Sequence, residues 1–127
     1  MYALVQKNFL LVFLGGGLGS GLRYLLSLAF QAKKTGFPLG TFVANILGSL
    51  FIGILLATFI KNQEWEQQYK LLAAVGFCGG FTTMSSFSAE NIQFLRDGHY
   101  GLFALYLTLT IVICLFCTFL GFQLIKS

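Results

Sequence analysis

Residues 76–88 read GFCGGFTTMSSFS, and they lie near the centre of an apolar segment that runs from about 69 to 96. Two consecutive glycines followed by hydroxyl side chains make a weak point in a helix, because glycine loses the most backbone entropy on folding. A break at membrane depth frees backbone N–H and C=O groups, which are tolerated only where protein, water or an ion satisfies them. The stretch predicts a membrane-spanning helix broken in its middle; the simpler alternative is an intact helix that uses its glycines for close packing.

Charge-free segments surround this stretch on both sides. Residues 35–60, 71–89 and 98–125 contain no Asp, Glu, Lys or Arg, and residues 8–32 contain only Arg23. The 127-residue chain is 57% hydrophobic and 9% charged, whereas a soluble domain has about 25% charged residues. This composition excludes a soluble enzyme domain, a nucleic-acid binder and a disulfide scaffold.

A bilayer core needs about 20 predominantly apolar residues per helix. We therefore expect an all-α membrane protein, a single domain with four transmembrane helices at about 7–32, 37–60, 69–96 and 100–125. Lys33 and Lys34 should end the first helix, and Pro38 should lie in the first turn of the second, where its missing N–H costs least. In the first helix Gly15 and Gly19 are spaced for close backbone packing, as are Gly17 and Gly21.

Lysine and arginine are divided almost evenly between the two ends of these helices. One end would hold Lys7, Lys61, Lys70 and Lys126, and the other Lys33, Lys34 and Arg96, with Arg23 if its side chain snorkels there. Orientation normally follows the excess of these residues on cytoplasmic loops, so the balance favours insertion in both orientations. This permits an antiparallel homodimer, which repeats in two chains what an inverted repeat does in one. The simpler alternative is that one extra charge sets a single orientation.

Polar side chains recur at helical spacing on two of the predicted helices. They are Thr41, Asn45 and Ser49 on the second helix, and Tyr106, Thr110, Cys114 and Thr118 on the fourth. A lone hydroxyl in a membrane helix usually bonds its own backbone, but two stripes together could line a wettable path. The amide of Asn45 needs a partner outside its own helix. Glu90 is the one carboxylate near a span, and it could cap a helix or pair with a base.

Phenylalanine supplies the other candidate contacts. The ring edge carries partial positive charge, so it could meet a weakly hydrated anion, and Phe87 shares a helix face with Met84 and the hydroxyl residues. The simpler role of each Phe is packing against lipid or core. The three cysteines lie in apolar segments without further metal ligands nearby, so we interpret them as small apolar residues.

Three motifs together resemble the Fluc (CrcB) family of bacterial fluoride channels, over essentially the whole chain. They are GGGLGS at 15–20 followed by Arg23, PLGT at 38–41 leading to Asn45, and GFCGGFTT at 76–83. The resemblance implies a dual-topology homodimer in the bacterial inner membrane, with two pores through which fluoride leaves the cell passively. It also implies a structural sodium ion held by the backbone carbonyls of Gly79 and Thr82.

The resemblance further implies which side chains meet the anion. The fluoride pathway carries over to Asn45, Ser85, Ser86, Phe87, Tyr106 and Thr110, with Arg23 and Thr41 in the vestibule. Met84 also belongs to the pathway, but the family usually has Phe at that position, so its assignment is weaker than that of Phe87. Two alternatives are a small dual-topology proton-coupled multidrug exporter, which should carry a Glu in its first helix, and a packing subunit that transports nothing. None of these functions is enzymatic.

Overall fold

The computed structural model describes residues 1–31 and 35–127, and its regular elements there are all helical. The elements are α1 (Tyr2–Gln31), α2 (Leu39–Lys61), α3 (Gln67–Tyr69), η1 (Lys70–Cys78), α4 (Gly79–Phe81), α5 (Met84–Arg96) and α6 (Tyr100–Lys126), of which η1 is a π-helix. Four stretches of the described residues are long and apolar enough to cross a membrane: α1, α2, Gln67–Arg96 and α6. The expected all-α architecture with four long apolar helices is confirmed.

The helix ends differ from the expected positions by a few residues. The first helix starts at Tyr2 rather than near residue 7, because a single Lys at position 7 does not interrupt a helix. Pro38 is the residue before α2 rather than part of its first turn, and its carbonyl accepts from the Phe42 N–H at 3.0 Å. The expected end of the first helix at residue 32, with Lys33 and Lys34, lies outside the described residues.

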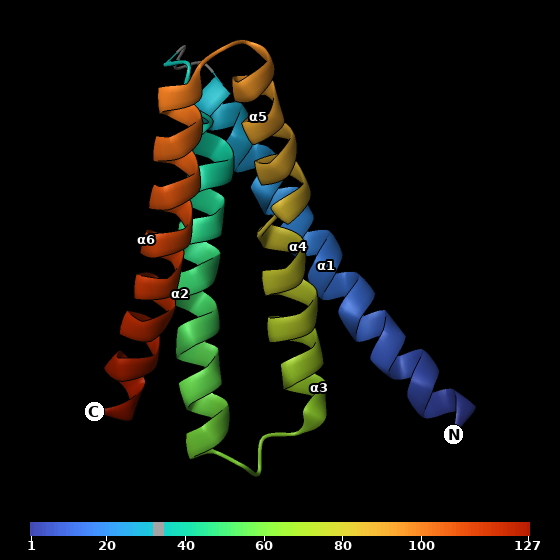
Figure 1. The fold of residues 1–127 in the computed structure, drawn as a ribbon. Coiled ribbons are helices and arrows are strands. Elements are labelled where there is room, and N and C mark those ends of the chain that lie inside the picture. Colours follow the sequence, from blue (N-terminus) through green and yellow to red (C-terminus); the bar gives the residue numbers. More distant parts are fainter. Residues whose placement is uncertain (32–34) are drawn as a thin grey trace.

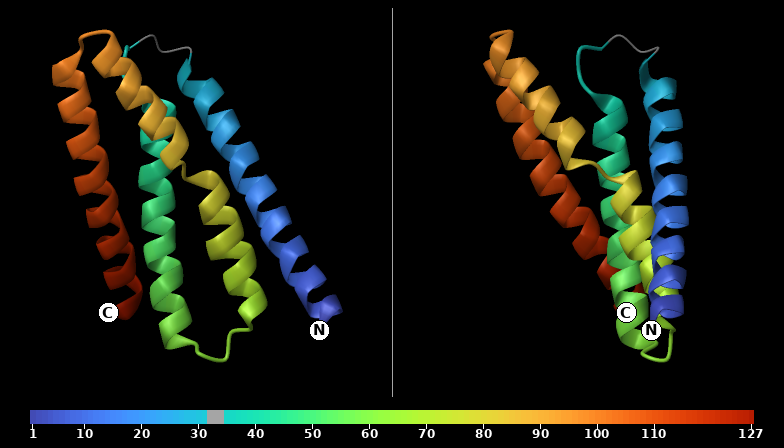
Figure 2. Two further views of the ribbon diagram at one scale, coloured as in Figure 1. Left: turned by 45° about the vertical axis from the view of Figure 1, so that its right-hand side comes forward. Right: turned by 90° about the vertical axis from the view of Figure 1, so that its right-hand side faces the viewer.

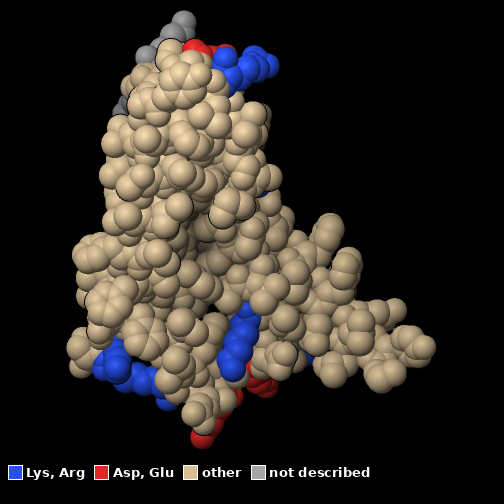
Figure 3. Space-filling view, viewed as in Figure 1, with Lys and Arg blue, Asp and Glu red and all other residues tan. Residues whose placement is uncertain are grey.

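The helices pack in two pairs that lie side by side (Figure 1). Helix α6 runs beside α2, and α1 runs beside the segment formed by α3, η1 and α4 (Figures 1 and 2). Both chain termini and the connection between α2 and α3 lie at the same end of the molecule (Figure 1). On the face drawn in Figure 3 the charged side chains gather mostly toward the two ends, as expected for a chain whose middle faces lipid.

Glycines allow both pairs to approach at backbone distance. A Cβ on Gly15 would collide with the Leu72 carbonyl oxygen, and a Cβ on Gly19 with that of Phe77. Gly53 and Gly121 play the same part between α2 and α6. The packing role expected for Gly15 and Gly19 is confirmed, whereas no described atom lies within 4 Å of a Cβ built on Gly17 or Gly21.

Few apolar side chains are buried inside the single chain. The largest fully buried one is Tyr106, which is 0% exposed and packs with Phe87 and Phe94. Large side chains along α1 and α6, such as Phe13 and Leu115, are mainly exposed. In a membrane this surface is available to lipid or to another helix, since lipid tails are as apolar as leucine.

The glycine contacts predict opposite effects for two alanine substitutions on α1. Gly19→Ala should lower the stability of the folded protein by about 1–3 kcal/mol or more, because the Phe77 backbone cannot move away freely. Gly17→Ala should leave stability unchanged or slightly higher, because alanine is the better helix former. Thermal unfolding of both purified variants in one detergent checks this, and equal unfolding temperatures would contradict the close α1 contact.

Candidate functional site

The third apolar stretch is not one continuous helix. Helix α4 ends at Phe81 and α5 begins at Met84, while Thr82 (φ −81°, ψ 158°) and Thr83 (φ −150°, ψ 119°) are extended. Gly79 and Gly80 themselves remain helical. The Thr83 hydroxyl accepts from the Ser86 N–H at 3.2 Å and so caps α5, which is the usual way to satisfy a helix start. We call Thr82 and Thr83 the interruption.

Asn45 on α2 satisfies the backbone of Thr83. Its Oδ1 accepts from the Thr83 N–H at 2.8 Å, and its Nδ2 donates to the Thr83 carbonyl at 3.2 Å. The side chain is 8% exposed. An amide is well suited to this task because it offers both a donor and an acceptor to the backbone N–H and carbonyl of one residue. The partner that Asn45 needs outside its own helix is therefore the interruption.

The carbonyls of Gly79 and Gly80 lose their helical donors at the interruption, whereas the Cys78 carbonyl keeps its own. The Cys78 carbonyl accepts from the Thr82 N–H at 3.0 Å and from its hydroxyl at 2.9 Å. The Gly80 carbonyl accepts from α1, at 3.1 Å from Arg23 Nε. The Gly79 carbonyl would accept from Thr83 in a continuous helix, but the Thr83 N–H donates to Asn45 instead. Arg23, which could snorkel to an interface by its position in the first span, donates here to the backbone just before the interruption.

Glu90 joins the two predicted polar stripes. Its Oε1 accepts from the Thr41 hydroxyl and its Oε2 from the Tyr106 hydroxyl, both at 2.6 Å. The sequence pattern points to all three residues but does not connect them. The available signal was that Glu90 is the one carboxylate of a membrane-spanning stretch, and such a residue needs a named partner.

Aromatic rings surround Tyr106 on several sides. The centroid of Phe87 lies 5.0 Å from that of Tyr106, and Phe37 and Phe94 approach it in edge-to-face geometry at 5.2 and 6.0 Å. Asn91, which sequence reasoning missed, donates from Nδ2 to the Phe87 carbonyl at 2.8 Å. Its buried Oδ1 has no hydrogen-bond partner among the described residues. The sequence feature that could have identified Asn91 is its position four residues after Phe87, on the same helix face.

A groove of about 530 Å³ lies beside the interruption. We call it the inner groove, and it contains Asn45, Thr82, Thr83, Met84, Phe87 and Thr110. The hydroxyl of Thr110 is buried, with the residue 6% exposed, and it has no partner within the described part of the chain. Met84 is 73% exposed at this groove. Ser85 and Ser86 do not line it; the Ser86 hydroxyl accepts from Thr83 Oγ1, and that of Ser85 lies 3.2 Å from the same atom.

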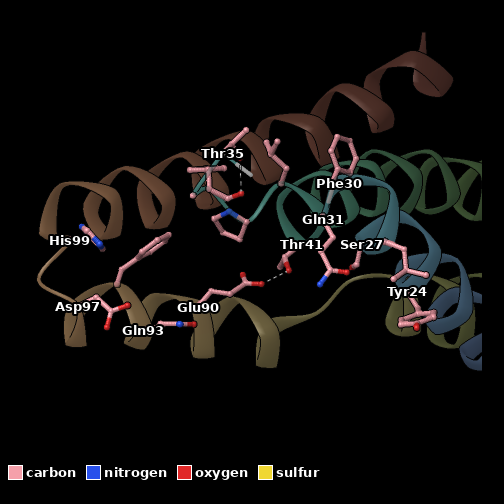
Figure 4. A pocket seen from close by; sticks show the side chains of 17 residues that line it. Tyr24, Ser27, Phe30, Gln31, Thr35, Thr41, Glu90, Gln93, Asp97 and His99 are labelled. Carbon is pink, nitrogen blue, oxygen red and sulfur yellow. Dashed lines mark hydrogen bonds between the residues drawn. The ribbon is translucent and has the colours of Figure 1, made fainter. Parts of the chain in front are cut away.

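A second cavity of about 690 Å³ lies toward the end of the molecule that carries the connection between α5 and α6 (Figure 4). We call it the outer pocket; Thr41 and Glu90 line it together with Gln93, Asp97 and His99. Tyr106 bonds to Glu90 of the outer pocket and packs on Phe87 of the inner groove. The structure thus brings Thr41, Phe87 and Tyr106 together between two hollows, with Asn45 and Thr110 on the inner side.

Three relatives among known proteins carry the same name. A protein of Gloeothece citriformis named "Fluoride-specific ion channel FluC" is 49% identical over 123 residues, covering 94% of this chain and 97% of the relative. Proteins of the same name from Azobacteroides pseudotrichonymphae and Leptospira interrogans are each 43% identical, covering 93% and 96% of this chain and 95% and 97% of the relatives. The family described as "CrcB-like protein, Camphor Resistance (CrcB)" matches residues 10–122. The chain therefore belongs to the CrcB family.

Proposed function

We propose that this chain forms a fluoride-selective channel in a bacterial inner membrane and lets fluoride leave the cytoplasm passively. The observation that carries the proposal is the inner groove, where Thr110 lies beside Asn45 and Phe87 and has a buried hydroxyl without a partner among the described residues. An unsatisfied buried donor costs about 1–3 kcal/mol, so an ion that accepts its hydrogen bond removes a standing penalty. The names of the relatives support fluoride as that ion.

The groove offers an anion several favourable contacts. The Asn45 amide has two N–H bonds, and one of them is used by the Thr83 carbonyl. The second can donate to an ion, as can the Thr110 hydroxyl. The positive edges of Phe87 and its neighbouring rings add weaker attraction. Together these groups replace part of the water that a small anion loses when it enters the membrane.

Beyond the groove the anion path meets the Glu90 cluster. The hydroxyls of Thr41 and Tyr106 both donate to Glu90 in this arrangement, so an anion must compete with the carboxylate for them. On this path the hydroxyls of Tyr106 and Thr41 would leave Glu90 in order to donate to the anion. We assign Arg23 to the vestibule, on the side of the path where the interruption lies. There its positive charge would attract the anion. Ser85 and Ser86 would contribute through their hydroxyls next to Thr83.

A passive pore is sufficient for export. Fluoride enters cells as neutral HF and is trapped as the anion at the higher internal pH, so an open pore removes it without fuel. The multidrug-exporter alternative gains no support, because the one carboxylate of a span, Glu90, is in the third stretch and already accepts two hydrogen bonds. Fluoride efflux from liposomes that contain only this protein, measured against chloride efflux, tests the proposal directly.

We further propose that the functional unit is an antiparallel homodimer with two pores. The inner groove contains polar backbone and side-chain groups and is open on the side of Met84, which would meet lipid in a single chain. Polar backbone at membrane depth requires cover by protein or water, and a second copy would supply it. The even distribution of Lys and Arg between the two ends supports insertion in both orientations.

A sodium ion at the centre of this dimer is the remaining part of the proposal. The carbonyls of Gly79 and Thr82 would hold it, two from each subunit. Unwound backbone carbonyls are known ligands of Na⁺ in membrane proteins. The residues fit such an ion: Gly79 is exposed, no described atom lies within 4 Å of a Cβ built on it, and its helical donor bonds Asn45 instead. The ion would hold the two copies together, with no part in moving fluoride.

Thr110 and Thr118 on α6 provide a matched pair of substitutions. Thr110→Val removes an unpartnered hydroxyl, so stability should stay equal or rise, while fluoride efflux per dimer falls because a donor to the anion is lost. Thr118→Val removes a hydroxyl that donates to the Ser49 carbonyl at 2.9 Å, so stability should fall by about 1 kcal/mol with efflux per folded dimer retained. Thermal unfolding and liposome efflux of both variants check this. Full efflux by Thr110→Val would remove Thr110 from the path.

Substitutions at Phe87 and Met84 distinguish an anion path from simple packing. Phe87→Ile keeps an apolar side chain but removes the ring edge, so efflux per reconstituted dimer should fall by about tenfold or more. Met84→Phe restores the residue usual in the family and should preserve or raise the rate. If Phe87→Ile changes stability alone, or if Met84→Phe is the more damaging change, the anion path lies on other side chains.

The dimer predicts two orientations in one membrane. A tag at the C-terminus should be accessible from both sides of the membrane within one population of cells, and a single accessible side would rule out the antiparallel arrangement. Two Lys residues added to the connection between α2 and α3 should bias insertion and reduce activity, because one orientation becomes scarce. Restored activity on coexpression with an oppositely biased copy would identify the shortage as the cause.

A further inference from the structure

The Gly80 carbonyl is held by two side chains of α1. It accepts from Arg23 Nε at 3.1 Å and from the Ser20 hydroxyl at 3.4 Å. In a continuous helix this carbonyl would accept from the N–H of Met84, which lies beyond the interruption. Arg23 and Ser20 are three residues apart and therefore lie on one face of α1. The first helix thus supplies the donors that the third stretch lacks.

The remaining polar groups around the interruption have different partners. Asn45 takes both the N–H and the carbonyl of Thr83, and the Cys78 carbonyl accepts from Thr82. Gly80 lies between Gly79 and Thr82, the two residues whose carbonyls we assign to the sodium ion. If α1 did not hold it, the Gly80 carbonyl would be a third backbone oxygen in the same short segment. Arg23 and Ser20 therefore decide which carbonyls the interruption can offer to an ion.

We propose that Arg23, assisted by Ser20, is a positioning residue for the cation site at the interruption. This inference rests on the sodium ion of the proposed function. A hydrogen bond from a charged donor is stronger than a neutral one, so Arg23 fixes the Gly80 peptide and, through the chain, the orientation of its neighbours. The site then presents only the carbonyls of Gly79 and Thr82 from each subunit.

The consequence of this arrangement is selectivity among monovalent cations. Selectivity between ions of different size depends on the number and rigidity of the oxygen ligands. When the Gly80 carbonyl is released, each subunit gains a third and more mobile oxygen near the ion. The site should then bind Na⁺ less tightly and accept the larger K⁺ more readily. Ligand-orienting residues of this kind typically change metal affinity by about 10–100-fold.

The sign of the effect distinguishes positioning from simple charge. Arg23 carries a positive charge close to the carbonyls that would hold a cation, so by repulsion alone its removal should strengthen Na⁺ binding. Positioning predicts the opposite, because the loss of Arg23 disorders the ligands. The two explanations therefore predict opposite changes in Na⁺ affinity for Arg23→Gln. Arg23→Lys keeps the positive charge and N–H donors but not the rigid guanidinium, so its Na⁺ midpoint should lie between those of the wild type and Arg23→Gln.

The test follows the thermal stability of the purified full chain as Na⁺ replaces N-methylglucamine at constant ionic strength, and it is repeated with K⁺. The wild type should be stabilised by Na⁺. Arg23→Gln should need at least about tenfold more Na⁺ to reach half of its maximal stabilisation, and K⁺ should stabilise this variant in place of Na⁺. Ser20→Ala should shift the same midpoint less, because its contact is longer. Ser27→Ala is the matched control on α1, since its hydroxyl bonds the Arg23 backbone carbonyl, and it should leave the midpoint unchanged.

Three results would overturn the inference. An unchanged Na⁺ midpoint in Arg23→Gln, with only a lower unfolding temperature, makes Arg23 a purely structural contact. A lower midpoint shows that charge repulsion prevails over positioning. A wild type whose stability is independent of Na⁺ removes both the sodium site and this inference. In that last case fluoride efflux from wild-type liposomes, measured separately, still decides whether the channel proposal stands.

Discussion

The pair of hydrogen bonds between Asn45 and Thr83 is the interaction on which the rest of the site depends. A backbone group without a partner in the bilayer core costs several kcal/mol, so two extended residues between α4 and α5 need an equivalent of helical bonding. The Asn45 amide provides it with an acceptor at 2.8 Å and a donor at 3.2 Å. This requires α2 to lie close to the interruption, and Gly48, one turn beyond Asn45, leaves room for the Thr82 methyl group.

The same constraint explains why α1 is packed so tightly. Arg23 can reach the Gly80 carbonyl only if α1 lies against η1 and α4, and Gly15 and Gly19 allow that contact. With α1 on one side and α2 on another, the polar groups of the interruption are satisfied from within the chain on two sides. The third side is the inner groove with exposed Met84. That distribution of partners is the physical basis for proposing a second copy over the groove.

Sequence reasoning predicted the parts of the structure that depend on local pattern. Charge-free segments located the four apolar helices, and the spacing of Gly15 and Gly19 predicted a packing surface. It did not locate the extended residues. Gly79 and Gly80 are the weaker helix formers, yet they stay helical. The helix is interrupted instead at the threonines, where Asn45 bonds the backbone of Thr83. The contacts of Arg23 and Glu90 were also missed. They join residues 57 and 49 positions apart in the chain, and no local pattern reports such distances. The assignment of pathway and sodium residues stays a prediction.

The order of the donors along the chain has a consequence for synthesis. Arg23 and Asn45 both precede the interruption that they satisfy, so they are already in the membrane when the third stretch leaves the ribosome. That stretch is the least apolar of the four, with mean hydropathy 1.3 against 2.3 and 2.4 for α2 and α6. Entering lipid alone, it would bring unsatisfied peptide groups with it. Beside α1 and α2 these peptide groups have partners, because Arg23 and Asn45 bond the backbone at Gly80 and Thr83.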